Sequence, residues 1–223
     1  MIIKKNKNRT FISVNLSDDE RESLNIRINK FNILDFAKSK TKIRVINTNN
    51  YHLTIAFLGS VLDSKLDILK KELGFIVNNF KPFECKITGL GAFPDLKSAR
   101  LIFLKIESPE LQELAKQIRK VVIRNGFKLD HDFKPHITIV RFKDLIELNN
   151  LDEINAIFKV DAFFLMQSVL TAAGPVYSKL EKFGIWFMSI IHRNHFFIFY
   201  NTALEKNQIK CILHWKSKLY ILC

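Results

Sequence analysis

Two short segments of the chain carry the same pattern of side chains that can transfer protons. The stretches YHLTIAFL and PHITIVRF, 84 residues apart, both contain His, then Thr two places later, then Ile. Both lie in apolar runs with the length and composition of buried strands. Because residues i and i+2 of a strand point to the same face, His52 projects with Thr54, and His136 with Thr138. If the two strands lie side by side or face each other, two imidazoles and two hydroxyls converge.

Such a group of side chains suits the cleavage of a phosphodiester at a ribose. One imidazole withdraws a proton from the attacking oxygen and the other protonates the leaving oxygen, each with a pKa near the working pH. The Thr hydroxyls can donate hydrogen bonds to the phosphoryl oxygens, where charge builds up. The alternative is that each His is a satisfied core residue of a sheet, which a single His would favour. The matched pair favours the catalytic interpretation.

Other catalytic chemistries have less support in the sequence. A zinc site needs further His, Cys or carboxylate ligands at short spacing, and no His or Cys residues form such a cluster. Phosphate-loop, dinucleotide-binding and nucleophile-elbow motifs are absent. His131, in the polar stretch DHDF, is interpreted as a loop residue. We therefore expect chemistry that needs no metal and no other cofactor.

The composition bears on the compartment and on the class of partner. The three Cys are sparse and unpatterned, which favours a reducing cytosol over a disulfide framework. The first residues lack the apolar core of a signal peptide, and no apolar stretch reaches about 18 residues, so we expect a cytoplasmic protein that does not span a membrane. The net charge of +13 agrees with RNA as a partner. The competing explanation is AT-rich coding, which also enriches Lys, Asn, Ile and Phe.

The order of the predicted elements indicates a duplicated α+β body. The strand FISVNLS ends at Ser17, which caps a following helix with an acidic first turn. The later elements are predicted in this order: the first motif strand, a helix over 61–80, strands over 83–93 and 99–106, a helix over 108–127, the second motif strand, a short helix over 150–158, and a closing strand pair over 158–170 and 174–183. We expect this order for two lobes that each carry one His-x-Thr strand.

Five blocks of the sequence resemble the 2H phosphoesterase superfamily, and most closely its RNA 2′,3′-cyclic phosphodiesterase family (LigT, also called 2′-5′ RNA ligase). The blocks are RTFISVNLS, YHLTIAFLGSV, GLGAFPDLKSARLIFLKI, GFKLDHDFKPHITIVRFK and SVLTAAGPVYSKLEKF. They occur in the order of the family and span about residues 9–183. The resemblance implies two lobes around a pseudo-twofold axis, each an antiparallel sheet flanked by helices, with the active site in the groove between them.

The resemblance also implies an activity and a role for each motif residue. The family hydrolyses the terminal 2′,3′-cyclic phosphate of RNA to a 2′-phosphate without a metal, and some members perform weak 2′-5′ ligation. By this resemblance His52 is the proton donor to the leaving oxygen and His136 is the base that activates water. Thr54 and Thr138 hold the phosphate. The expected protein is a monomer that acts on RNA ends.

Three positions bear on how far the family pattern extends. Arg141 occupies a position where the family often carries a basic residue. Strict alternation along a strand places it opposite to His136, so it needs a bulge or a strand end to reach the phosphate, and a solvent-facing role is the alternative. KIRVINTNN replaces a segment in which the family often has Trp, and Phe103 also stands where Trp is common. These departures concern base stacking and leave the phosphate chemistry unchanged.

Residues 184–223 differ from the rest of the chain. They contain both Trp residues, half of the His residues and no Asp or Pro. We therefore divide the chain into a phosphoesterase body over 1–183 and a C-terminal extension over 184–223. An extra element packed on the body, a basic-aromatic contact to RNA, and translation of a normally noncoding segment are the three explanations of the extension. The absence of helix caps and of clean periodicity favours the last explanation or a poorly ordered appendage.

Two alternatives to the RNA cyclic phosphodiesterase follow from the same residues. One is an RNA-binding module that retains the site without turnover. The other is a 2H phosphodiesterase that acts on a different cyclic or 2′-5′ phosphodiester.

Overall fold

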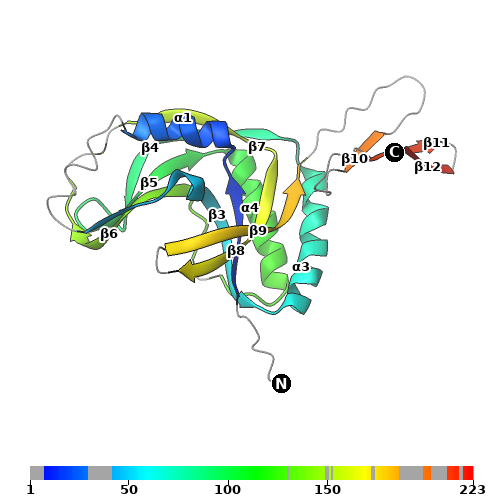
Figure 1. Cartoon of the computed structure of the whole chain (residues 1–223), viewed down its shortest axis with the longest axis horizontal. Coiled ribbons are helices and arrows are strands. Elements are labelled where there is room, and N and C mark those ends of the chain that lie inside the picture. The colour runs from blue at the N-terminus through cyan, green and yellow to red at the C-terminus, as the bar shows by residue number, and fades with distance from the viewer. Residues whose placement is uncertain are drawn as a thin grey trace.

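Figure 1 shows the computed structural model, in which one large antiparallel sheet and a few helices form an α+β fold. The structure describes residues 8–29, 42–129, 131–148, 151, 153–171 and 174–185, together with the backbone of 198–201, 210–215 and 218–222. The described strands of the body are β1 (Asn8–Asn15), β2 (Ile43–Val45), β3 (His52–Val61), β4 (Phe83–Phe93), β5 (Ala99–Glu107), β6 (His136–Ile146), β7 (Asn155–Val160), β8 (Ala162–Thr171) and β9 (Gly174–Gly184). The described helices are α1 (Asp18–Asn29), α3 (Asp63–Ile76) and α4 (Pro109–Arg124), with 3-10 helices η1 (Thr48–Asn50) and η2 (Val77–Asn79).

The sheet has two halves that meet at the motif strands. Its strand order is β7-β4-β5-β6-β3-β1-β8-β9, and β2 pairs with β6 beside β3. The contact between the halves is short, because Leu53 and Ile137 are the only register pair assigned between the described parts of β3 and β6. This arrangement agrees with the expectation of two lobes, with the junction at the strands that carry the His-x-Thr pattern.

The same strand–helix–strand unit occurs in both halves. In the first, β1 and α1 precede β3, and in the second, β5 and α4 precede β6. A Ser begins each helix: the Ser17 hydroxyl accepts a hydrogen bond from the Glu20 amide at 3.3 Å, and the Ser108 hydroxyl accepts one from the Leu111 amide at 3.2 Å. The Glu20 carboxylate in turn accepts from the Ser17 amide at 2.8 Å, which completes a capping box.

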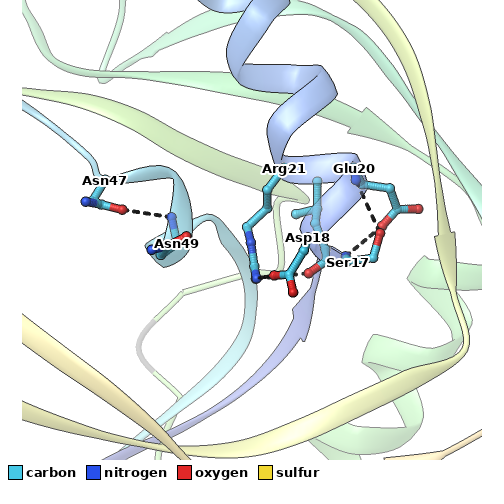
Figure 2. Close-up of polar contacts among 7 residues, drawn as sticks. Ser17, Asp18, Glu20, Arg21, Asn47 and Asn49 are labelled. Carbon is cyan, nitrogen blue, oxygen red and sulfur yellow. Dashed lines mark hydrogen bonds and ion pairs between the residues drawn. The ribbon is translucent and has the colours of Figure 1, made fainter.

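Figure 2 shows these contacts at the start of α1, where Asp18 also binds Arg21 one turn later. It also shows η1 nearby, the turn that leads into the first motif strand. Its cap is Asn47, whose side-chain oxygen accepts from the Asn49 amide at 2.9 Å. η1 leads directly into β3, which begins with His52 of the first motif.

The main core lies between the sheet and helices α3 and α4, which lie side by side in Figure 1. Apolar residues at helical spacing on both helices are buried, including Leu69 and Leu73 of α3 and Leu114 and Ile118 of α4. The helix predicted over 108–127 ends as expected, with Gly126 at a φ of 80° just beyond α4. The sheet face that packs against these helices is therefore the apolar face of the motif strands.

The helix predicted over 150–158 is wrong. Residues 149, 150 and 152 lie outside the described residues, and Asn155–Val160 forms β7, which pairs with the edge of β4. Ile154 and Phe158 are both buried, and their spacing of four positions fits a helix as well as a strand. Pairing with β4 satisfies the backbone of this segment, so the tertiary contact overrides the local helical pattern.

The C-terminal extension contains a second, small sheet in its described part. Strands β10 (Ile198–Asn201), β11 (Lys210–Trp215) and β12 (Lys218–Leu222) pair antiparallel in chain order, and none of them pairs with the main sheet. The body itself continues slightly beyond the boundary predicted at 183. The last residue of β9 is Gly184, and Ile185 is buried in the main core.

Candidate active site

The two motif strands lie side by side where they begin. β3 and β6 run antiparallel, and Leu53 is paired with Ile137. In an antiparallel pair, the residues before and after such a pair also lie opposite each other. This register therefore places the His of each motif opposite the Thr of the other motif. Convergence of the four side chains required that the two motif strands be neighbours, and β3 and β6 are neighbours at this point.

These four side chains share one face of the two strands. Leu53 and Ile137, between them in sequence, have no exposed surface and point into the core. By strand alternation the His and Thr residues point to the opposite face, where they are half-buried. We call this the histidine face, defined by His52, Thr54, His136 and Thr138.

Both imidazoles are held in the same way. His52 Nδ1 lies 2.7 Å from the Asn50 carbonyl oxygen, and His136 Nδ1 lies 2.7 Å from the Lys134 carbonyl oxygen. A carbonyl only accepts hydrogen bonds, so Nδ1 carries the donated proton in both rings. Nε2 is then the nitrogen that can gain or lose a proton toward a substrate. The repeated contact means that both halves present the same reactive atom.

Aromatic rings pack against each imidazole. The His52 ring lies 5.1 Å from the Phe11 ring and 5.0 Å from the Tyr177 ring, which meets it edge-on. The His136 ring lies 5.3 Å from Phe93 and 5.4 Å from Phe103, which also meet it edge-on. These contacts limit rotation of both rings, and they remove water from one side of each imidazole.

Phe103 is held in place by the strand beside it. It pairs with Gly91 of β4, and its ring stacks on Phe93 at 4.3 Å between centroids. A side-chain Cβ at Gly91 would come within 2.5 Å of the Phe103 ring. The absence of a side chain at position 91 therefore lets Phe103 lie against the backbone and face His136.

The surroundings favour the neutral form of both imidazoles in the free protein. Burial lowers the pKa of His52 below its ordinary value of 6.5, the hydrogen bond to Asn50 opposes this, and the charges of His136 and Arg141 lower it further. Burial also lowers the pKa of His136, the hydrogen bond to Lys134 opposes this, and the charge of Arg141 lowers it further. The two rings therefore lie close enough for one to affect the titration of the other.

A β-bulge brings Arg141 to the histidine face. Ile102 of β5 pairs with Val140, but the next residue, Phe103, pairs with Thr138, so Ile139 is an extra residue in β6. One extra residue reverses the alternation that follows it. Arg141 is exposed on the same side as Thr138, and its charge acts on both imidazoles. The bulge that Arg141 needs in order to reach this face is present.

Arg119 of α4 connects the two motifs and was not identified from the sequence. Its guanidinium donates to the Ile55 carbonyl oxygen at 3.3 Å and also to the carbonyl oxygen of His131. Ile55 follows the first motif, and His131 lies in the segment that leads to the second. His131 is exposed and contributes a backbone oxygen here, which agrees with its interpretation as a loop residue. A single Arg in an amphipathic helix gives no sequence signal for such a contact.

The described part of the chain shows neither a metal-ligand cluster nor a reactive thiol. No three His, Cys, Asp or Glu side chains there come together as a ligand set for a metal ion. Cys85 is a free, buried thiol, and burial raises its pKa to about 11, so it is not a nucleophile at neutral pH. Among the described helices, none has the length and apolar character needed to cross a membrane.

The chain resembles known proteins over most of its length. The family model described as the 2′-5′ RNA ligase superfamily matches residues 44–170. An Archaeoglobus fulgidus protein named RNA 2′,3′-cyclic phosphodiesterase is 31% identical over 183 residues, which cover 78% of this chain and 99% of that protein. A Thermotoga maritima protein of the same name is 30% identical over 182 residues, which cover 78% of this chain and 94% of that protein.

Solved structures give the same result for the fold. A protein of Thermus thermophilus superimposes with a TM-score of 0.66 at 28% identity and covers 79% of this chain and 97% of that protein. LigT of E. coli in its apo form superimposes with a TM-score of 0.63 at 25% identity and covers 80% of this chain and 98% of LigT. The paired His-x-Thr strands, the LigT-like fold and the matching family model together make this chain a member of the 2′-5′ RNA ligase superfamily.

Proposed function

We propose that this protein hydrolyses the terminal 2′,3′-cyclic phosphate of RNA to a 2′-phosphomonoester, with two histidines as general acid and general base. The observation that carries the proposal is the pair of imidazoles on neighbouring strands, each with Nδ1 bound to a carbonyl and Nε2 left for the substrate. The relatives named RNA 2′,3′-cyclic phosphodiesterase support the choice of substrate.

In the proposed reaction His136 Nε2 accepts a proton from a water molecule, and the water oxygen attacks the phosphorus. The bond from phosphorus to the ribose 3′ oxygen breaks, and His52 Nε2 donates a proton to that oxygen. The product has a 2′-phosphate and a 3′-hydroxyl. After the reaction His136 carries the added proton and His52 has lost its proton. Exchange with solvent restores the starting protonation state of both imidazoles.

The phosphoryl oxygens gain negative charge as the water attacks. Thr54 and Thr138 lie on the same face as the imidazoles and are proposed to donate hydrogen bonds to these oxygens. Arg141 adds a fixed positive charge beside them. A guanidinium is well suited to this role because its planar donors match phosphate geometry.

The assignment of donor and acceptor depends on the charge of the bound phosphate. His52 must be protonated to act as the donor, yet in the free protein burial lowers the pKa of His52, and the charge of a protonated His136 lowers it further. An anionic phosphate between the rings raises the pKa of both. The proposal therefore requires that the bound substrate raises the pKa of His52 more than that of His136.

Incubation with an oligonucleotide that bears a 2′,3′-cyclic end, with EDTA present, tests the proposal. Conversion of that end to a 2′-phosphate supports both the reaction and the expectation that no metal or other cofactor is needed. Binding without turnover would instead support an RNA-binding module. Turnover restricted to 2′-5′ oligoadenylate or to another cyclic phosphate would support the second alternative.

Weak 2′-5′ ligation would follow the same course with the 5′-hydroxyl of a second strand in place of water, so that the phosphate joins the 2′ oxygen of one strand to the 5′ oxygen of the other and the 3′ oxygen leaves. Incubation of the cyclic-ended oligonucleotide with a second RNA that has a 5′-hydroxyl tests it. The protein is proposed to act as a monomer, which sedimentation measures directly. The cytoplasm is the proposed location, which fractionation of the source cells tests.

A further inference from the structure

Arg44 and Arg141 form a pair of cations beside the histidine face. They are directly opposite each other in the antiparallel pairing of β2 with β6. Directly opposed residues of antiparallel strands carry their side chains on the same face, and like charges in this position repel each other. Within the described part of the chain, no carboxylate forms an ion pair with either of them. A bound anion would remove this repulsion.

The Arg44 side chain reaches from one half of the sheet to the other. Its strand, β2, belongs to the half that contains β6, whereas its Nη2 atom lies against Gly174, the first residue of β9. A Cβ at position 174 would overlap with this atom. The glycine therefore leaves the space in which the guanidinium lies, and the cation is held between β2 and the β8–β9 hairpin.

Tyr177 connects this cation to the histidine face. Its ring meets the His52 ring at 5.0 Å. Burial raises the pKa of the Tyr177 hydroxyl, and the charges of Arg141 and Arg44 both oppose this, so both guanidinium groups lie near it. Arg141 also acts on the two imidazoles. Arg44 lies opposite Arg141 on β2, and its Nη2 atom lies against Gly174 at the start of β9.

We propose that Arg44, beside Arg141, forms a second phosphate-binding subsite, which holds the internucleotide phosphate next to the cyclic end of an RNA strand. The inference rests on the proposed function and names the substrate more closely. The terminal phosphate occupies the two imidazoles and the Thr hydroxyls, so a second cation beyond Arg141 has a ligand only if the substrate has a second phosphate. A nucleoside 2′,3′-cyclic phosphate has none, whereas a strand of two or more nucleotides does.

The test compares a cyclic-ended dinucleotide with a nucleoside 2′,3′-cyclic monophosphate. Arg44→Gln is expected to lower kcat/KM for the dinucleotide about tenfold, the lower end for loss of a charge-assisted hydrogen bond, mainly through KM. For the mononucleotide, kcat/KM of Arg44→Gln is expected to stay within about twofold of the wild-type value, the range of ordinary surface substitutions. Arg44→Lys keeps the charge and loses the planar donors, so its kcat/KM for the dinucleotide is expected to lie between the values of the wild type and of Arg44→Gln.

Lys71→Gln is the matched control, because it removes one exposed positive charge from α3, on the helix side of the sheet. Equal losses for both substrates in Arg44→Gln, no loss for the dinucleotide, or the same loss in Lys71→Gln would each overturn the subsite. The salt dependence adds a second readout: for the dinucleotide, the slope of log KM against log salt falls by about 0.7 in Arg44→Gln, as expected for one contact to a single strand.

A binding measurement separates this inference from the proposed function. Fluorescence anisotropy is recorded with a 3′-phosphorylated dinucleotide and a 3′-phosphorylated mononucleotide, neither of which needs to react. If the wild-type protein turns over no cyclic phosphate, the proposed function fails. Weaker binding of the dinucleotide alone by Arg44→Gln would still support the subsite, and unchanged binding of the dinucleotide would overturn it.

Discussion

The strands β3 and β6 are two versions of one structural element, and on the histidine face they differ at the matched position two residues beyond the bulge. Both begin with the motif His, and both contain an extra residue directly after the motif Thr, Ile55 in β3 and Ile139 in β6. Two residues beyond each bulge the chain returns to the histidine face, with Phe57 in the first strand and Arg141 in the second. The shared backbone supplies two equivalent imidazoles, and the difference supplies a positive charge on one side only.

The backbone carbonyl oxygens at the two bulges accept hydrogen bonds from different kinds of donor. The Ile139 carbonyl accepts a hydrogen bond at 2.9 Å from the Ile46 amide, which follows β2. The Ile55 carbonyl accepts from the side chain of Arg119 at 3.3 Å. One half therefore uses a backbone amide just beyond a neighbouring strand, and the other uses a side chain from α4. The difference shows that the same local irregularity can be stabilised by whichever donor the surrounding fold provides.

The largest expected effect comes from removal of either imidazole. His52→Ala and His136→Ala are each expected to lower kcat/KM at least about 10²-fold, because each removes a positioned general acid or base. The double variant is expected to lose much less than the product of the single losses, since the two residues act as a unit. Steady-state kinetics with a cyclic-ended oligonucleotide measures all three.

The division of roles between the imidazoles has its own test. A substrate whose leaving group needs no proton is expected to restore turnover in His52→Ala and to leave His136→Ala slow. Restoration in the His136 variant alone would reverse the assignment. Equal failure of both would mean that the imidazoles position the substrate and do not transfer protons.

Substitution at the matched position, Arg141 in β6 and Phe57 in β3, is expected to have the next largest effect on kcat/KM. Arg141→Gln removes a charge near the reacting phosphate and is expected to lower kcat/KM about tenfold or more. Phe57→Leu, the equivalent change in the first strand, keeps an apolar side chain and is expected to change kcat/KM less than about threefold. Comparable losses in the two variants would contradict the conclusion that only the second half supplies charge.

The pH profile sharpens the comparison of the two environments. A lowered pKa favours the neutral ring, so the base becomes available at a lower pH and the acid also loses its proton at a lower pH. Both limbs of a kcat/KM profile, which reports the free enzyme, therefore move below the ordinary His value of 6.5. We expect a bell with its maximum below that value. A maximum clearly above 6.5 would show that the free protein does not depress these pKa values.

Removal of the Arg119 side chain tests whether its hydrogen bond to the Ile55 carbonyl stabilises the bulge in β3. Arg119→Gln leaves the Ile55 carbonyl oxygen without its donor and is expected to lower the free energy of unfolding by about 1–3 kcal/mol. Arg124→Gln is the control on the same helix, because its exposed contact to Glu72 is expected to contribute about 0–1 kcal/mol. Urea unfolding measures both. Equal losses would mean that the Ile55 contact is no stronger than a surface ion pair.

The smallest effect is expected from removal of the C-terminal extension. A chain that ends at Ile185 retains β9 and the hydrogen bond from the Ile185 amide to the Asp161 carbonyl at 2.6 Å, and we expect its kcat/KM to equal that of the full chain. A chain that ends at Phe183 loses burial of Ile185, which lowers stability by about 1.5–3 kcal/mol. Loss of soluble protein in the chain ending at Ile185 would show that the extension completes the fold.

Much of the site was predictable because its signals are local. Strand alternation placed each His with its Thr, and the helix starts at Ser17 and Ser108 follow from capping residues that act within one turn. Periodicity also located α3 and α4, since burial of one helical face depends on residues three and four apart. Patterns of this kind need no knowledge of which elements become neighbours.

The tertiary structure decided which residues meet. The bulge at Ile139 exists because β5 pairs with β6 in a shifted register, and only this shift brings Arg141 to the imidazoles. The segment that forms β7 has a helical spacing, and only the free edge of β4 makes it a strand. Arg44 reaches the site because Gly174, in the other half, leaves room for its guanidinium. Such contacts depend on residues far apart in the chain, and local pattern carries no information about them.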